Sequence, residues 1–137
     1  MRDSECIFCK IIEGEIPSTT VYEDESFKAI LDISPAAKGH VIILTKNHAR
    51  NIFELSEEDA SKIMVVAKKI ATALEKTYHC EGINILQNNG EVAGQTQFHV
   101  HVHVIPRYKG DTVDIGWKNL DMPEDAAAIA GEIKANL

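Results

Sequence analysis

The sequence lacks the features that mark a secreted or membrane-bound protein. It contains only three cysteines in 137 residues, an odd number that is too small for a disulfide framework, so we expect reduced thiols. The charged start, Met1–Glu5, runs into only a few apolar residues, too few for a signal peptide or a membrane span. We therefore expect a cytoplasmic protein with no membrane partner.

Positive charge is also scarce. The chain has 14 lysines and arginines against 21 aspartates and glutamates, which gives a net charge of −7. This balance argues against a broad basic surface for nucleic acid or anionic lipid. We expect no nucleic-acid partner, and any phosphate-binding site has to be local.

The chain also lacks internal divisions. No Pro/Ser-rich linker, low-complexity tract or repeat interrupts it, and its 45% hydrophobic and 26% charged residues are ordinary for a globular domain. One packed core is expected at this length. We predict a single domain over residues 1–137.

Five strands are predicted from the hydrophobic pattern. Residues 20–22 and 27–31 flank a polar turn and suit an antiparallel hairpin, and residues 41–44 form a continuously apolar strand. Two further strands are predicted at residues 83–86 and 98–105.

Three helices are predicted around these strands. The apolar spacing of residues 7–12 predicts a short helix that ends near Glu13. A long helix is predicted to begin after the N-cap Ser56 and to end before Gly82, and Pro123 is predicted to open a last, alanine-rich helix. The apolar face of the long helix comprises Ala60, Ile63, Met64, Ala67, Ile70, Ala71 and Leu74. The element order indicates an α+β domain around an antiparallel sheet.

The segment from Phe98 to Arg107 alternates histidine with apolar residues at the period of a β-strand with two unlike faces. The alternation places His99, His101 and His103 on one face. The other face presents Val100, Val102 and Val104 to the core. Buried imidazole nitrogens need partners, so packing alone explains three of them poorly. Metal binding and nucleophilic or acid–base chemistry both remain open.

The segment Gly94–Gln97, just before this strand, offers a glycine, a hydroxyl and side-chain amides that suit phosphate oxygens. Taken alone, it would equally be an ordinary glycine-containing turn. His79 has no motif around it, and we interpret it as structural.

Cys6 and Cys9 have the two-residue spacing of half a tetrahedral zinc site, which needs two further ligands. Cys80 has no partner at a useful spacing, and we interpret it as a buried thiol.

These residues together resemble the histidine triad (HIT) family, whose signature alternates three histidines with hydrophobic residues. The resemblance follows the family's order over most of the first 110 residues. The matching segments are Ile7–Ile12, Ile16–Pro17, Tyr22–Asp24, Asp32–Pro35, Gly39–Val41, Asn88–Gly90 and Gly94–Thr96.

The resemblance implies a HIT-like fold, in which a five-stranded antiparallel sheet carries one long helix, a short N-terminal helix and a C-terminal helix. The domain core would span about residues 5–108, followed by a tail and helix over residues 109–137. It also implies a homodimer in which a sheet edge and a helix face pair with a second copy.

The activity implied by the resemblance is hydrolysis or transfer at the α-phosphorus of a purine nucleoside 5′-monophosphate that carries an amine, acyl or similar leaving group. His101 would attack phosphorus and form a nucleotidyl-histidine, which water then cleaves. His103 and His40 match phosphate-contacting and relay histidines, and the Thr96 hydroxyl would contact phosphate or pass a proton to the leaving group.

Further positions are carried over as nucleotide-binding residues. Asp32 matches a carboxylate on the ribose hydroxyls, and Asn88 and Gln95 match phosphate-site positions. Apolar residues match the purine pocket, although Ile30 would equally be a core residue. The set comprises Phe8, Ile11, Leu31, Asp32, Asn88, Gln95, Thr96, His101 and His103, with Ile30 and Ile33 beside them.

The resemblance to bacterial members also implies a structural zinc ion, whose ligands would be Cys6, Cys9, His48 and His99. A fully ligated zinc leaves no open position, so catalysis is expected to need no metal.

Two other functions remain open. One is a dinucleoside polyphosphate hydrolase, a branch that tends to carry glutamine in place of Asn88. The other is a nucleotide-binding or scaffold protein whose hydrolysis is incidental. The segment after Arg107, with Trp117, resembles the bacterial branch, so substrate preferences do not transfer from animal relatives.

Overall fold

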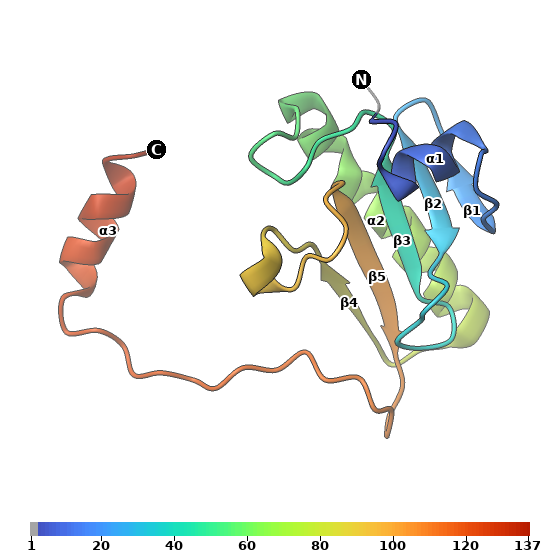
Figure 1. Ribbon diagram of the computed structural model, residues 1–137. Coiled ribbons are helices and arrows are strands. Elements are labelled where there is room, and N and C mark those ends of the chain that lie inside the picture. The colour runs from blue at the N-terminus through green and yellow to red at the C-terminus, as the bar shows by residue number, and fades with distance from the viewer. Residues whose placement is uncertain (1–2) are drawn as a thin grey trace.

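The computed structural model of the protein describes residues 3–137 and is built on a five-stranded antiparallel sheet (Figure 1). The strand order is β1-β2-β3-β5-β4, and each neighbouring pair is antiparallel. The strands are β1 (Thr20–Glu23), β2 (Phe27–Leu31), β3 (Val41–Thr45), β4 (Gly82–Leu86) and β5 (His101–Arg107). The predicted α+β class and the hairpin of the first two strands are confirmed.

The helices are α1 (Ile7–Glu13), α2 (Glu57–Tyr78) and α3 (Ala126–Lys134), with one 3₁₀ turn, η1 (Glu91–Ala93). α1 ends as predicted, because Gly14 takes a left-handed conformation and donates its N–H to the carbonyl of Ile11. The prediction that Pro123 opens the last helix is wrong, since α3 begins three residues later after the N-cap Asp125. His79 closes α2 in a left-handed conformation, which is a structural role.

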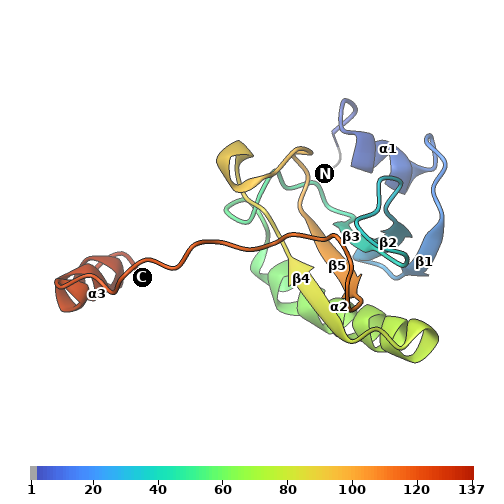
Figure 2. The same ribbon diagram turned by 90° about the horizontal axis from the view of Figure 1, so that it is seen from below.

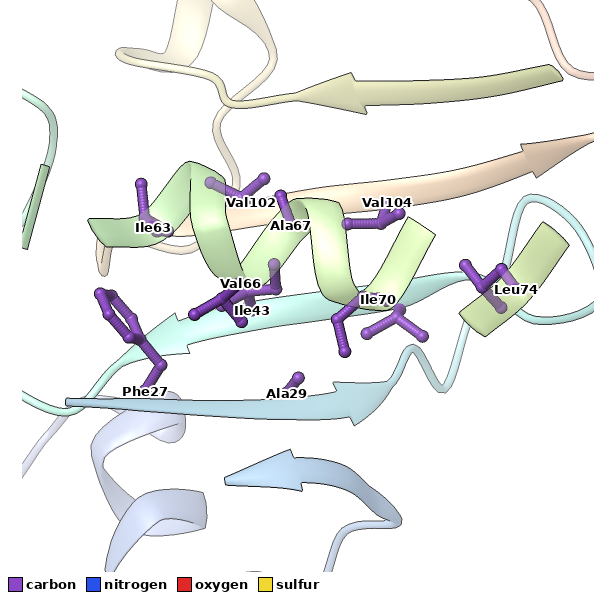
Figure 3. Packing of buried hydrophobic residues seen from close by; sticks show 11 residues of the cluster. Phe27, Ala29, Ile43, Ile63, Val66, Ala67, Ile70, Leu74, Val102 and Val104 are labelled. Carbon is purple, nitrogen blue, oxygen red and sulfur yellow. The ribbon is translucent and has the colours of Figure 1, made fainter. Parts of the chain in front are cut away.

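α2 covers one face of the sheet, and α1 lies on the other (Figure 2). Ser56 caps α2 as predicted, because its hydroxyl accepts the N–H of Asp59. Figure 3 shows the packed core that α2 forms with β2, β3 and β5. The predicted apolar face is partly wrong: Ala60 and Met64 are exposed, whereas Val66 is buried. The face in contact with the sheet is thus rotated away from Met64, at the margin of the apolar stripe.

The continuously apolar strand β3 is explained by this two-sided cover. Val41 and Ile43 pack toward α2, whereas Ile42 and Leu44 pack toward α1. Ile42 pairs with His103 and Leu44 with His101, so both histidines lie on the α1 face of the sheet.

The chain after β5 leaves the sheet and ends in α3, which stands apart from the rest (Figures 1 and 2). Its start is held by Arg107, whose guanidinium donates two 2.9 Å hydrogen bonds to the Asp111 carboxylate and keeps the pKa of that carboxyl well below its usual range. Beyond this point Trp117, Leu120 and Met122 are exposed. Within residues 3–137, no helix is both long and apolar enough to cross a membrane.

Candidate active site

The histidine strand begins later than predicted. β5 starts at His101 instead of Phe98, because the N–H of Val100 donates to the carbonyl of Ala49, outside the sheet ladder, at 2.8 Å. His99 is fully buried, whereas His101 and His103 are partly exposed on the α1 face. The three imidazoles therefore lie in two different environments, one buried and one open to the α1 face of the sheet.

A cavity of about 460 Å³ opens between α1 and the sheet, and His101 and His103 line it. Its other polar lining is Asp32, Ser18, Ser34, Thr96 and Gln97. Its apolar lining is Ile7, Phe8, Ile11, Ile16, Pro17, Ile30, Leu31, Ile33 and Ile42. The cavity thus combines a mostly apolar lining with a few polar groups, which is typical of sites for small molecules.

The imidazole of His101 is oriented by its neighbour in the chain. Its Nδ1 lies 2.7 Å from the carbonyl oxygen of His99, which only accepts, so Nδ1 carries the proton and donates it. Burial lowers the pKa of His101, so the ring is neutral at pH 7 and Nε2 bears a free lone pair. The rings of Phe8 and His103 flank it edge-on, with centroids 4.9 and 5.0 Å away.

His40 and His103 form a chain of hydrogen bonds with a fixed direction. The N–H of Ala36 donates to Nδ1 of His40 at 3.0 Å, so the proton of His40 sits on Nε2. Nε2–H donates to Nδ1 of His103 at 2.9 Å and lies 3.5 Å from the Asp32 carboxylate. Because Nδ1 of His103 accepts this bond, the proton of His103 lies on Nε2, which is free to donate to another group.

Burial, reinforced by His101 and His40, lowers the pKa of His103 to about 4. Burial also lowers the pKa of His40, against the opposing effect of Asp32. Both rings are therefore neutral near pH 7. His103 therefore offers an anion the hydrogen bond of its Nε2–H instead of a positive charge.

Asp32, His40 and His103 bring their ligand atoms within 4.8 Å of one another, a set that would suit a divalent cation. A cation needs the lone pair of His40 Nε2, which carries the proton. The other tautomer would set Nδ1–H of His40 against the N–H of Ala36. The cluster is consequently a proton-bearing chain and a poor metal site.

A second cluster brings together the four predicted zinc ligands, Cys6, Cys9, His48 and His99. All four ligand atoms lie within 4.8 Å of one another. The Nδ1 of His99 is 3.3 Å from Cys6 Sγ, 3.5 Å from Cys9 Sγ and 3.1 Å from Nδ1 of His48. The edges of a tetrahedron around zinc with such ligands measure roughly 3.3–3.8 Å.

Proton positions in this cluster favour a cation. Nε2–H of His99 donates to the carbonyl of Thr45 at 2.7 Å, which leaves the lone pair of Nδ1 directed at the cysteines. Burial lowers the pKa of His99 to about 4, so the ring stays neutral. Burial raises the pKa of the Cys9 thiol, so a thiolate there needs a cation beside it.

Two predicted phosphate residues do not line the cavity. Gln95 is buried, and its amide donates to the carbonyls of Arg50 and Gln97 while its oxygen accepts the N–H of Gly90. It holds the loop that carries Thr96, and Asn88 lies beside Gly94 in the same loop. Their contact with phosphate remains a prediction.

Several functional groups were missed by sequence reasoning. The N–H of Ala36 and the carbonyl of Thr45 fix two imidazoles, but main-chain groups leave no signal in side-chain type. Pro17 and Ser18 also line the cavity, beside Gln97 of the predicted Gly94–Gln97 segment. Pro17 belongs to a segment that matched the family pattern and could have been assigned to the pocket.

Comparisons with known proteins agree with this geometry. The family model described as HIT domain matches residues 13–110. A crystal structure of a member of the HIT family from Bacillus subtilis superposes with a TM-score of 0.91 and 46% identity, covering 98% of each chain. The adenosine 5′-monophosphoramidase hnt1 of Schizosaccharomyces pombe is 38% identical over 134 residues, which are 96% of this chain and 98% of that protein.

A zinc-bound histidine triad family protein from Mycobacterium smegmatis has a TM-score of 0.76 and 36% identity, covering 95% of this chain and 96% of that one. The three relatives are similar over nearly the whole chain, whereas the family model begins at residue 13, after Cys6 and Cys9.

Proposed function

Because the chain belongs to the histidine triad (HIT) family, we propose that it cleaves a purine nucleoside 5′-monophosphate from an amine, acyl or similar leaving group. The adenosine 5′-monophosphoramidase of Schizosaccharomyces pombe, similar over 96% of this chain, supports this class of substrate. The observation that carries the proposal is the tautomer of His101, which lines the cavity. Its Nδ1–H donates to the carbonyl of His99, so the lone pair of Nε2 is free to attack.

In the first step, Nε2 of His101 attacks the α-phosphorus, and a nitrogen–phosphorus bond forms as the bond to the leaving group breaks. Nδ1–H stays bonded to the carbonyl of His99, which stabilises the charge that develops on the ring. The Thr96 hydroxyl, on the cavity wall, supplies a proton to the departing amine. In the second step water attacks the phosphorus and returns a proton to the Thr96 oxygen, the nitrogen–phosphorus bond breaks, and His101 is released as the neutral imidazole with its proton on Nδ1.

Charge on the phosphoryl oxygens is met by hydrogen bonds. Nε2–H of His103 donates to one oxygen, and His40 keeps that proton in place by donating to Nδ1 of His103. Asp32, whose carboxylate lies 3.5 Å from His40 Nε2, accepts from the ribose hydroxyls, and the apolar lining of Phe8 and Ile11 holds the purine.

We further propose that Cys6, Cys9, His48 and His99 hold one structural zinc ion, supported by their geometry and by the zinc-bound relative. With four protein ligands, zinc would stabilise the fold and leave no position for water. Catalysis is then carried by the imidazoles and the Thr96 hydroxyl.

A homodimer is also proposed. β4 forms an edge of the sheet and exposes Ile85, and the neighbouring helix α2 exposes Met64 and Val65. A second copy would cover these surfaces and part of the tail over residues 109–137. We propose that this tail is distinct from a domain core of about residues 5–108. A cytoplasmic location, where thiols remain reduced, fits the free cysteines.

The decisive experiment incubates the purified protein with a fluorogenic adenosine phosphoramidate and, separately, with diadenosine polyphosphates. The wild type should cleave the phosphoramidate, and His101→Gly should lose at least about 1000-fold in kcat/KM. A matched control is His79→Gly, which removes an imidazole from the cap of α2 that is not among the residues lining the cavity.

Turnover retained by His101→Gly would refute the mechanism. Faster cleavage of the polyphosphates would instead identify the enzyme as a dinucleoside polyphosphate hydrolase. Tight AMP binding without turnover of either substrate would support a binding protein.

A further inference from the structure

The short helix α1 is tied to the rest of the molecule at its first turn. It has only seven residues, fewer than an isolated helix needs to persist in water. Cys6 is its N-cap, with Sγ accepting the N–H of Cys9 at 3.3 Å, and Cys9 is 2% exposed. Both cysteines face His48 and His99, which come from segments far apart in the sequence.

The same turn of α1 carries a wall of the nucleotide cavity. Phe8 lies between the two cysteines, lines the cavity and places its ring edge-on to His101, with centroids 4.9 Å apart. The ring also contacts His99, with centroids 5.9 Å apart. A shift of α1 would therefore move the purine wall and the support of the nucleophile together.

His99 connects the cysteine–histidine cluster to the nucleophile along a second route. Its ring joins the cysteines through Nδ1 and Thr45 through Nε2–H, while its carbonyl accepts Nδ1–H of His101 at 2.7 Å. A change in the position of the His99 ring would therefore also move the His99 carbonyl, which fixes the proton of His101 on Nδ1.

We propose that Cys6, Cys9, His48 and His99 form a clamp that assembles the nucleotide pocket, so that zinc binding and nucleotide binding strengthen each other. The clamp rests on the proposed nucleotide site and zinc site. With the clamp closed, α1 presses Phe8 against His101 and completes the apolar wall. With the clamp open, the cysteines no longer hold the first turn of α1 against His48 and His99, and the pocket loses that wall while α2 and its core remain packed on the other face.

Thermodynamic linkage gives the clamp a measurable signature, because a coupling between two ligands has to be reciprocal. Calorimetry would measure the Kd of AMP for the zinc-loaded protein and for protein stripped by a chelator, with metal content verified by elemental analysis. Stripping should weaken AMP binding at least about 10-fold. Saturating AMP should tighten the binding of Zn²⁺ by the same factor. Hydrogen exchange that rises in α1 and not in α2 distinguishes this coupling from general destabilisation of the fold.

Hydrogen exchange tests the clamp without nucleotide. Removal of the metal should raise amide exchange in residues 6–13 strongly, while exchange in α2 stays protected. Cys6→Ser is the sharpest variant, because serine preserves the N-cap while removing a thiolate ligand. Cys80→Ser is its matched control, since Cys80 is a buried thiol outside the cluster.

A thermodynamic cycle that combines the Phe8→Ala substitution with metal removal tests whether the coupling passes through Phe8. In Phe8→Ala, stripping the metal should weaken AMP binding by less than about 3-fold, because the wall that the clamp positions is already missing. An unchanged 10-fold effect in Phe8→Ala would overturn the role of Phe8.

The outcomes separate the clamp from the proposed function. Verified metal loss with unchanged α1 exchange and unchanged AMP affinity would overturn the clamp and leave the hydrolase proposal intact. Protein that contains no zinc and takes none up would also overturn the clamp. Increased α1 exchange without any AMP binding would support a clamp on α1 and refute the nucleotide site.

Discussion

The protein contains two histidine clusters that look alike as sets of metal ligands and differ in the position of their protons. In the cysteine–histidine cluster, Nε2–H of His99 donates to the Thr45 carbonyl, and the free lone pair points at the cysteines. In the chain beside the cavity, the Ala36 N–H occupies the lone pair of His40, and a proton points at His103. The Thr45 carbonyl leaves His99 with a lone pair suited to a metal ion, whereas the Ala36 N–H leaves His40 with a proton to donate.

This difference shows that residue type and proximity do not define a metal site. Both clusters place their ligand atoms within 4.8 Å, and both contain two imidazoles. The cysteine–histidine cluster adds two thiols, one of them buried, whereas the other adds the Asp32 carboxylate. Hydrogen bonds to main-chain groups place the protons differently in the two clusters, so one offers lone pairs and the other offers a proton.

The largest expected difference is in metal content and stability. His48→Ala should lose its zinc and on the order of 5 kcal/mol of unfolding free energy, because a structural zinc site is part of the folding free energy. His40→Ala, the matched variant in the other cluster, should keep one equivalent of zinc and lose about 100-fold in kcat. Elemental analysis, urea unfolding and the phosphoramidate assay measure the three quantities. Loss of zinc from His40→Ala would break the comparison.

The second expected difference is a pH dependence of stability. The pKa of His103 is lowered to about 4, whereas the unfolded chain binds this proton near pH 6.5. The unfolded state therefore binds more protons between these values, and the stability present above pH 6.5 is lost as the pH falls to about 4. From pH 7.5 to 4.5 this contribution amounts to about 2–3 kcal/mol.

Urea unfolding of Cys6→Ser and of Cys6→Ser/His103→Gln at both pH values would isolate this contribution, since neither protein should release metal on acidification. The variant with glutamine should lose about 2–3 kcal/mol less at pH 4.5. Equal losses in the two proteins would show that the His103 ring is protonated in the folded state.

The smallest expected effect concerns Thr45. Its carbonyl fixes the His99 tautomer, whereas its hydroxyl donates to the Asn47 carbonyl at 2.9 Å. Thr45→Val keeps the carbonyl, so zinc content should not change and unfolding free energy should fall by about 1 kcal/mol. Loss of zinc in this variant would mean that the hydroxyl, 3.3 Å from His99 Nε2, orients the ring.

Elements with a strong local signal were predictable. Gly14 ends α1, and Ser56 caps α2, because each depends on a conformation or a side-chain bond within a few residues. Boundaries set by distant contacts were not predictable. β5 starts late because Val100 bonds to Ala49, and Met64 is exposed because the sheet selects which side of α2 it contacts.

The sequence by itself determined the alternation of imidazoles and valines, the cysteine pair and the family, since these depend on residue type and spacing along the chain. Only the tertiary structure decided which imidazoles share a cavity, which meet the cysteines and where each proton sits. The reason is physical: a histidine tautomer is set by the group opposite its ring, and for His40 and His99 that group is a main-chain atom brought there by folding.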